Sequence, residues 1–223
     1  MADENDSGQA VPRRTDRRRA RTRAALVRAA QHLIADGRSH VAVLEITQLA
    51  DVGMGSFYNH FESKEELFQA AVDDALEHHG DLLDTLTSQL EDPAEVFAQS
   101  FRLTGRLHRL QPEMSRVLLS YATSLVTSDR GLAPRALRDI ERANEAGRFT
   151  VADPEVALMI AAGSAMALGQ LLHDRPERDD AAAADQMTED LLRMYGVPAE
   201  EAAEICRRPL PDLGAAIGAG SAA

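Results

Sequence analysis

The chain has 223 residues, a formal net charge of −12 at pH 7, and 44% hydrophobic but only 4% aromatic residues. This length can build a core for one large or two smaller domains, and the residue mixture favours helices over strands. The single cysteine, Cys206, excludes an internal disulfide and a CxxC zinc site, and without an apolar segment typical of a signal peptide or membrane span we expect a cytoplasmic protein.

Residues 1–21 form a polar segment that runs into the arginine-rich stretch PRRTDRRRARTR. A charged run without apolar periodicity predicts a disordered basic arm. Residues 11–64 hold ten Lys and Arg against five Asp and Glu, whereas residues 71–223 hold 14 against 26. The positive charge of an otherwise acidic chain is therefore concentrated near its N-terminus, where it favours a nucleic-acid partner.

A first helix is predicted over residues 22–35 and a short second helix over residues 43–50, where Val43, Ile46 and Leu49 recur at helical spacing. Asp51 tolerates the left-handed backbone of a tight turn, and Gly53 can stand at the N-cap of the next helix. Two short helices joined by such a turn indicate a helix-turn-helix.

The next helix begins within the run VGMGSFYNHF, residues 52–61. Phe57 and Phe61 lie four residues apart, so both can pack inward while the polar residues between them face out. A helix of this kind fits the major groove of DNA, which is roughly 12 Å wide. A plain helical hairpin is the alternative, but packing alone requires neither Lys64 nor the arginine-rich arm.

The rest of the chain predicts helices separated by Pro and Gly. Ser63 and Glu66 form a capping box that opens a helix extending to about His79. Later helices are predicted over residues 81–90, 93–110, 112–127, 133–146, 154–173, 181–195 and 198–206. Residues 208–223 are low in complexity and predict a flexible tail. We therefore expect an all-α fold with a three-helix domain over residues 22–68 and a larger helical domain over residues 69–207.

The stretch ITQLADVGMGSFYNHFESKEELF resembles the DNA-binding signature of TetR/AcrR-type bacterial transcriptional regulators, in which Tyr-x-x-Phe ends the helix-turn-helix and Ser-Lys-Glu-Glu-Leu opens the next helix. Asp51 and Gly53 depart from the Gly and Ser that the family commonly has in the turn and at the cap. Ala42 replaces the Ser or Thr often found at the start of the second helix. The missing side-chain cap at Gly53 costs only about a few tenths of a kcal/mol.

The resemblance implies a homodimeric regulator, more often a repressor, that binds a palindromic operator and releases it when a small, mostly apolar effector binds. It implies no cofactor, and the chain has no catalytic motif such as GxSxG or HExxH. An architectural DNA-binding protein without an effector is the alternative. The predicted DNA contacts are Arg17, Arg18, Arg19, Arg21, Thr47, Met54, Gly55, Ser56, Tyr58, Asn59, His60 and Lys64.

The larger domain has two candidate surfaces, although plain core stripes have the same spacing. The predicted effector pocket comprises Phe97, Phe101, Thr104, His108, Met114, Leu118 and Tyr121. The resemblance implies a dimer interface of late helices, for which we select Met159, Gly163, Met166, Gln170, Leu191 and Met194. Asp74 and His78 have a spacing that permits metal binding, but their acidic surroundings favour a solvated surface, and we expect no metal.

Overall fold

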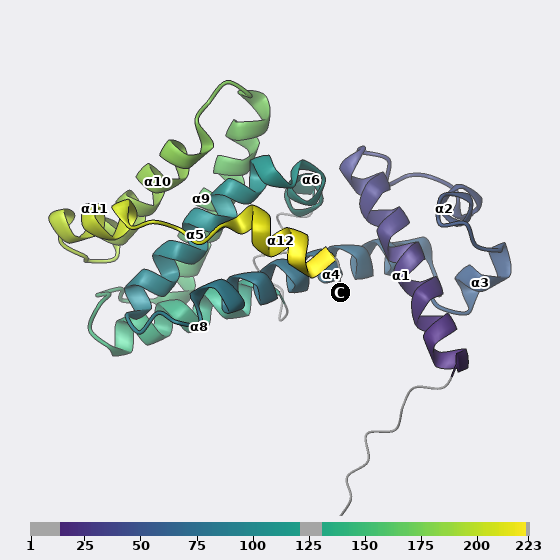
Figure 1. Cartoon of the computed structure of the whole chain (residues 1–223), viewed down its shortest axis with the longest axis horizontal. Helices are drawn as coiled ribbons and strands as arrows, with labels where there is room; N and C mark the ends of the chain where they lie inside the picture. Colours follow the sequence, from purple (N-terminus) through teal and green to yellow (C-terminus); the bar gives the residue numbers. More distant parts are fainter. Residues whose placement is uncertain (1–13, 121–130, 222–223) are drawn as a thin grey trace, which may run out of the picture.

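The computed structural model describes residues 14–120 and 131–221, and its described elements are all α-helices, as predicted. A small head contains α1 (Arg14–Ala35), α2 (Val43–Leu49) and α3 (Met54–Tyr58). A larger body contains α5 (Pro93–Leu110), α6 (Pro112–Ser120), α8 (Leu132–Glu145), α9 (Pro154–Asp174), α10 (Asp180–Met194) and α11 (Ala199–Arg207). Helix α4 (Lys64–Thr87) runs from the head along the body (Figure 1).

Helix α4 is one continuous helix, so the predicted break after His79 and the separate helix over residues 81–90 are wrong. Gly80 lies inside it, where a glycine costs about 1 kcal/mol relative to alanine. A Cβ atom at Gly80 would lie only 2.7 Å from the Arg135 guanidinium of α8. Gly80 is therefore explained by the close approach of a side chain from another helix, which no local pattern reveals.

The N-terminal arm is shorter than predicted, because residues 14–21 form the first turns of α1. Arginine and alanine are strong helix formers, and Asp16 in the first turn is well placed against the helix dipole. Arg17, Arg18, Arg19 and Arg21 thus project from a helix. The remainder of the predicted arm, residues 1–13, lies outside the described residues.

The predicted flexible tail contains a further helix, α12 (Leu213–Ser221). Asp212 caps it by accepting a hydrogen bond from the amide of Ala215 at 3.0 Å. Leu213 is buried, and Leu210 and Ile217 pack against the core cluster that contains residues of α1 and α4. The composition of the segment is simple, but these three apolar side chains bind it to the rest of the molecule.

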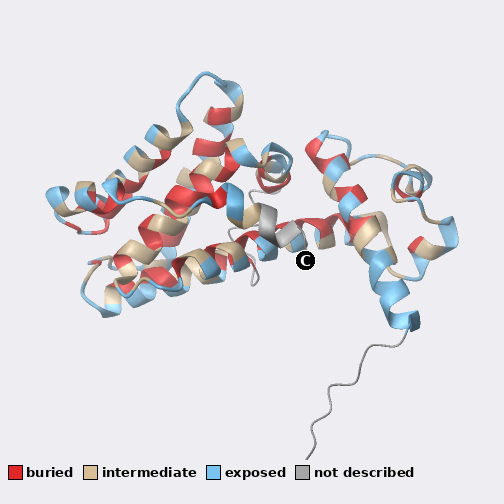
Figure 2. Cartoon of the chain, viewed as in Figure 1, coloured by how far each residue is buried: buried red, intermediate tan, exposed pale blue. Residues whose placement is uncertain are grey.

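The described core forms two clusters, one around the head and α4 and the other inside the body (Figure 2). In the body, the rings of Phe97, Phe149 and Tyr195 contact one another edge to face at centroid distances between 5.2 and 5.5 Å. The Tyr195 hydroxyl donates to the carbonyl of Ala157 at 2.6 Å, so its polar end is satisfied inside the core. This cluster fixes α5, α9 and α10 around the space described below.

Candidate functional site

The turn between α2 and α3 has the geometry predicted for a helix-turn-helix. Asp51 has φ of 53°, and among the described residues no other non-glycine residue has a positive φ. Gly53 and Ala42 are the N-caps of α3 and α2, and neither provides a side-chain hydrogen bond. The left-handed residue lets the chain reverse direction between two very short helices.

Aromatic side chains hold α3 against the head. Phe57 and Phe61 are buried, with ring centroids 6.1 Å apart, as the sequence predicted. The Arg23 guanidinium of α1 lies 5.3 Å from the centroid of the Phe61 ring, a cation–π distance. These contacts fix the orientation of α3 relative to the arginines of α1.

The outer face of α3 contains most of the predicted DNA contacts. Met54 is 41% and Tyr58 61% exposed, and Gly55 and Asn59 are also exposed. Ser56 and His60 are half-buried. These six residues form one accessible surface of the head.

Thr47 does not belong to this accessible surface. It is only 2% exposed, and its hydroxyl donates to the Leu44 carbonyl at 2.9 Å. The helical spacing placed it on α2 correctly but could not show that its face turns inward. We therefore remove Thr47 from the predicted DNA contacts.

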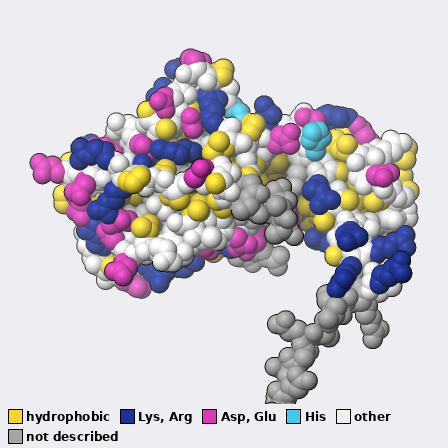
Figure 3. Space-filling model, viewed as in Figure 1, with side chains coloured by type: hydrophobic (Ala, Val, Ile, Leu, Met, Phe, Trp, Pro, Cys, Tyr) yellow, Lys and Arg dark blue, Asp and Glu magenta, His cyan; other side chains and the backbone are white. Residues whose placement is uncertain are grey.

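Basic side chains of α1 lie beside the accessible surface of α3. Arg17, Arg18, Arg19 and Arg21 are all exposed on the first turns of α1, where Figure 3 shows a group of Lys and Arg side chains. Burial, followed by the charges of Arg19 and Arg23, lowers the pKa of His60. His60 is therefore a neutral ring at pH 7 beside several fixed cations.

Lys64 begins α4 beside the head. Its Nζ donates to the Val41 carbonyl at 3.5 Å, which directs the side chain toward the start of α2. The predicted capping residue Ser63 accepts from the amide of Glu66 at 3.1 Å. The Glu66 carboxylate in turn accepts from the amide of Glu62 at 2.6 Å, one residue earlier than in a standard capping box.

A second candidate site is a cavity of about 120 Å³ between α4, α5, α8 and α9. The predicted residues Phe97, Phe101 and Thr104 line it. The predicted pocket included no residue of the walls formed by α4, α8 and α9. The other lining residues are Leu76, Leu83, Asp84, Ser100, Leu132, Ala133, Arg135, Ala136, Asp139, Leu158, Ala161, Ala162, Ala165 and Met166.

The remaining predicted pocket residues are not among the residues lining the cavity. His108 is buried and hydrogen-bonded elsewhere, Leu118 is fully buried core, and Met114 borders a groove between α1, α4 and α6. Tyr121 lies outside the described residues. The N-terminal part of the predicted stripe on α5 lines the cavity. Its C-terminal part, from His108 onward, faces α6 and the core instead.

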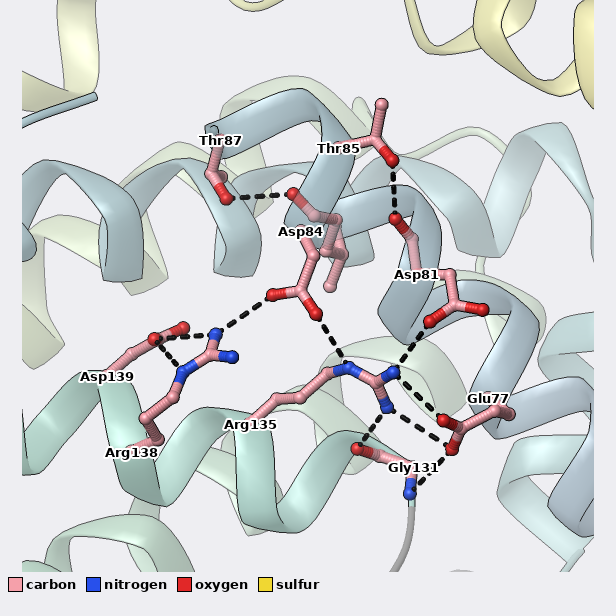
Figure 4. A network of polar contacts seen from close by, with 10 residues as sticks. Glu77, Asp81, Asp84, Thr85, Thr87, Gly131, Arg135, Arg138 and Asp139 are labelled. Carbon is pink, nitrogen blue, oxygen red and sulfur yellow. Dashed lines mark hydrogen bonds and ion pairs between the residues drawn. The ribbon is translucent and has the colours of Figure 1, made fainter. Parts of the chain in front are cut away.

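One wall of the cavity is polar and belongs to an ion-pair network between α4 and α8 (Figure 4). Arg135 donates to Asp81 at 2.7 Å, to Asp84 at 2.8 Å and to Glu77 at 2.9 Å. Arg138 donates to Asp84 at 2.9 Å and to Asp139 at 2.9 Å. The acidic face of α4 is thus paired with arginines, and the described residues contain no metal-binding group of three His, Cys, Asp or Glu.

The two carboxylates of this wall have opposite pKa shifts. Burial raises the pKa of Asp139, and its hydrogen bond with Arg138 only partly offsets this effect. Burial also acts on Asp84, but hydrogen bonds from Arg138 and Arg135 outweigh it and lower the pKa. The cavity therefore contains one firmly ionised carboxylate and one that is more readily protonated.

Two buried histidines lie on helices that line the cavity, His79 on α4 and His108 on α5. The Thr104 hydroxyl donates to the Ser100 carbonyl at 2.9 Å, so it accepts from Nε2 of His79 at 3.0 Å. His108 and Ser115 are joined by a 2.7 Å hydrogen bond between Nδ1 and Oγ. Burial is the main reason that the pKa of His79 falls to about 3 and that of His108 to about 4. Both rings are neutral at pH 7.

Helices α9 and α10 have an unusually apolar exposed face. Val156, Met159, Ile160 and Met194 are between 37% and 61% exposed, and Gly163 and Gln170 are also exposed on α9. Contrary to the expectation that no segment resembles a membrane span, α9 is long and apolar enough to cross a membrane by length and composition alone, and it is the only such helix among those described. Two of the predicted interface residues do not lie on this exposed face. Met166 lines the cavity, and Leu191 is buried at the edge of a groove along α10.

Comparison with protein-family models identifies both parts of the chain. Residues 26–71 match the model described as bacterial regulatory proteins, tetR family. Residues 92–208 match the model described as the C-terminal domain of tetracyclin repressor-like proteins. The two matches correspond to the head with the start of α4 and to the body.

A curated relative, the HTH-type transcriptional repressor DhaR of Mycobacterium sp. (strain GP1), is 48% identical over 56 residues. That match covers 25% of this chain, and the chain spans about a quarter of the relative, 27% of its length. This relationship is therefore limited to a single segment of each protein.

Solved structures extend the similarity to most of the chain. RolR without ligand is 38% identical with a TM-score of 0.66, over 85% of this chain and 98% of RolR. RolR in complex with its ligand resorcinol is 36% identical with a TM-score of 0.61, over 88% and 98%. A gamma-butyrolactone receptor shares the fold at 20% identity and a TM-score of 0.60, over 84% and 96%. The chain therefore belongs to the TetR family of transcriptional regulators, which are DNA-binding proteins and not enzymes.

Proposed function

We propose that this protein is a cytoplasmic repressor that binds a palindromic operator as a homodimer and releases it when a small hydroxylated aromatic compound binds. The cavity beside α4 is the observation that carries the proposal. A volume of about 120 Å³ is close to that of an apolar protein cavity of about 150 Å³ that accepts benzene. An architectural protein would need no such cavity.

The chemistry of the cavity walls supports this class of effector. Phe97, Phe101 and several alanine and leucine side chains offer an apolar surface for a ring. Asp84, Arg135 and Asp139 form a polar end where hydroxyl groups could hydrogen-bond. RolR, which is 36% identical, was solved with resorcinol, a ring with two hydroxyl groups.

The exposed surface of the head supports operator binding. Exposed residues of α3 are flanked by arginines that can neutralise phosphates, and Lys64 is the predicted phosphate contact at the start of α4. The half-sites of a palindrome, about 34 Å apart, require two heads held at a fixed separation. A dimer would supply this separation.

The proposed release can be tested with resorcinol and duplex DNA selected by the protein from random sequence. Resorcinol should weaken operator binding about 5- to 150-fold, the usual range of allosteric coupling. Ala161→Leu adds three carbon atoms to the buried wall of the cavity, so this variant should bind the operator normally but lose the response. Fluorescence anisotropy measures both quantities.

Ala199→Leu is the matched control, because Ala199 is exposed on α11 and does not line the cavity. Thermal melting of both variants checks that they fold. If resorcinol and other single-ring phenols leave operator binding unchanged, the proposed release by a small hydroxylated aromatic compound is refuted.

The proposed dimer uses the apolar face of α9 and α10. Met159→Asp places a charge on this face, and we expect monomers in sedimentation and a large loss of operator affinity, because each monomer reaches only one half-site. Leu110→Asp is the control, since Leu110 is 53% exposed and lies on α5 rather than on α9 or α10. A dimeric Met159→Asp variant would contradict the assigned interface.

A further inference from the structure

The side chains on the outer face of α3 are chemically unusual for a surface expected to read DNA. The helix itself, MGSFY, contains no acidic and no basic residue. Met54 and Tyr58 are the most exposed large apolar side chains of α3, at 41% and 61%. Both side chains lie on the surface that the family resemblance assigns to DNA, where an apolar group can contact a thymine methyl.

Several cations of the head have partners within the head, whereas the exposed arginines at the start of α1 lie on a different helix from the outer face of α3. Arg38 forms an ion pair with Glu45, and Lys64 donates to the Val41 carbonyl. The Arg23 guanidinium lies against the Phe61 ring, and the lowered pKa of His60 keeps its imidazole neutral. None of these groups is positioned as an extended cationic side chain projecting from α3.

Base recognition in the major groove depends on side-chain type. Guanine is read mainly by Arg or Lys and cytosine by Asp or Glu, whereas Asn or Gln reads adenine and apolar groups contact the thymine methyl. Asn59 is the exposed C-cap residue of α3: its backbone N–H donates to the Phe57 carbonyl, and its carboxamide side chain is accessible to a partner. The outer face of α3 therefore carries no Arg, Lys, Asp or Glu, the types that favour G·C pairs, whereas Met54, Tyr58 and Asn59 are of the types that favour A·T pairs.

We propose that α3 reads an A·T-rich sequence in each half-site, with Met54 and Tyr58 contacting thymine methyl groups and Asn59 pairing with an adenine. The proposal rests on the proposed operator binding and adds the base composition of the operator. The arginines at the start of α1 then supply affinity through phosphates without choosing the sequence.

Selection of bound duplexes from a random pool should return half-sites whose central positions are A·T pairs. Replacing thymine with uracil at those positions removes only the methyl groups, and it should weaken binding about fourfold for each contacted thymine. Met54→Ala should reduce this difference between thymine and uracil. Asn59→Ala should weaken binding about tenfold at one adenine position and relax the preference there.

Leu110→Ala is the matched control, because it removes an exposed apolar side chain from α5 and should preserve the full thymine preference. Thermal melting verifies the fold of each variant. Half-sites rich in G·C pairs, or equal binding of thymine and uracil duplexes, would overturn the proposal while leaving operator binding intact. Failure to select any sequence would overturn operator binding as well.

Discussion

Arg135→Met is expected to loosen α4 from α8 and to weaken effector binding together. The Arg135 guanidinium bonds to Glu77, Asp81 and Asp84, which lie on one face of α4 at spacings of four and three residues. Without the arginine these like charges repel one another. The arginine side chain is 20% exposed and its partners more so, and we expect a loss of about 1 to 3 kcal/mol in unfolding free energy.

The same substitution removes a hydrogen-bond donor from the cavity. A hydrogen bond to a charged group is worth about 1.5 to 3 kcal/mol, so resorcinol affinity should fall about tenfold or more. Urea unfolding and calorimetric titration measure the two effects. Arg142→Met is the control, since Arg142 is exposed on the same helix and lies outside the cavity. Equal losses in both variants would refute the special position of Arg135.

Acidification from pH 7 to pH 5 is expected to lower the unfolding free energy by roughly 2 kcal/mol for each of His79 and His108. Burial holds their folded-state pKa values near 3 and 4, below the ordinary value of 6.5. The unfolded chain therefore takes up protons as the pH falls through 6.5, while the folded chain does not. The stability is complete above about pH 7 and is lost progressively below pH 6.5.

Urea unfolding at the two pH values measures this loss directly. His79→Gln keeps a polar side chain but cannot titrate, so the pH-dependent loss should shrink by roughly 2 kcal/mol relative to the unsubstituted protein. The His79→Gln, His108→Gln double variant should lose little unfolding free energy between pH 7 and pH 5. A double variant that loses as much stability as the original protein would show that other groups are responsible.

The head could be predicted from the sequence because its determinants are local. The positive φ of Asp51, the cap at Gly53 and the inward positions of Phe57 and Phe61 all follow from residues a few positions apart. Two features of the head were predicted wrongly: residues 14–21 belong to α1 rather than to a disordered arm, and Thr47 is buried, since burial of a small polar side chain depends on which neighbour covers it.

The cavity was predicted only in part because it depends on contacts between distant segments. Phe97 and Thr104 belong to the apolar stripe on α5, whereas Arg135 and Asp139 lie on α8, more than 25 residues further along the chain. The acidic run of α4 was interpreted as a solvated surface. Its spacing could have indicated a complementary helix, because the arginines of α8 also recur at helical intervals.

Because α4 is one continuous helix, a movement of its cavity end is transmitted to its head end. Leu83 lines the cavity and Lys64 begins the helix at the head, a separation of about 28 Å at 1.5 Å per residue. If α4 tilts as a rigid rod by about 5° around the cavity, its other end moves about 2.5 Å. The rise between successive bases of a strand is about 3.4 Å. A shift in the cavity too small to disturb the packing of the body would thus change the register of a head on DNA by most of one base step.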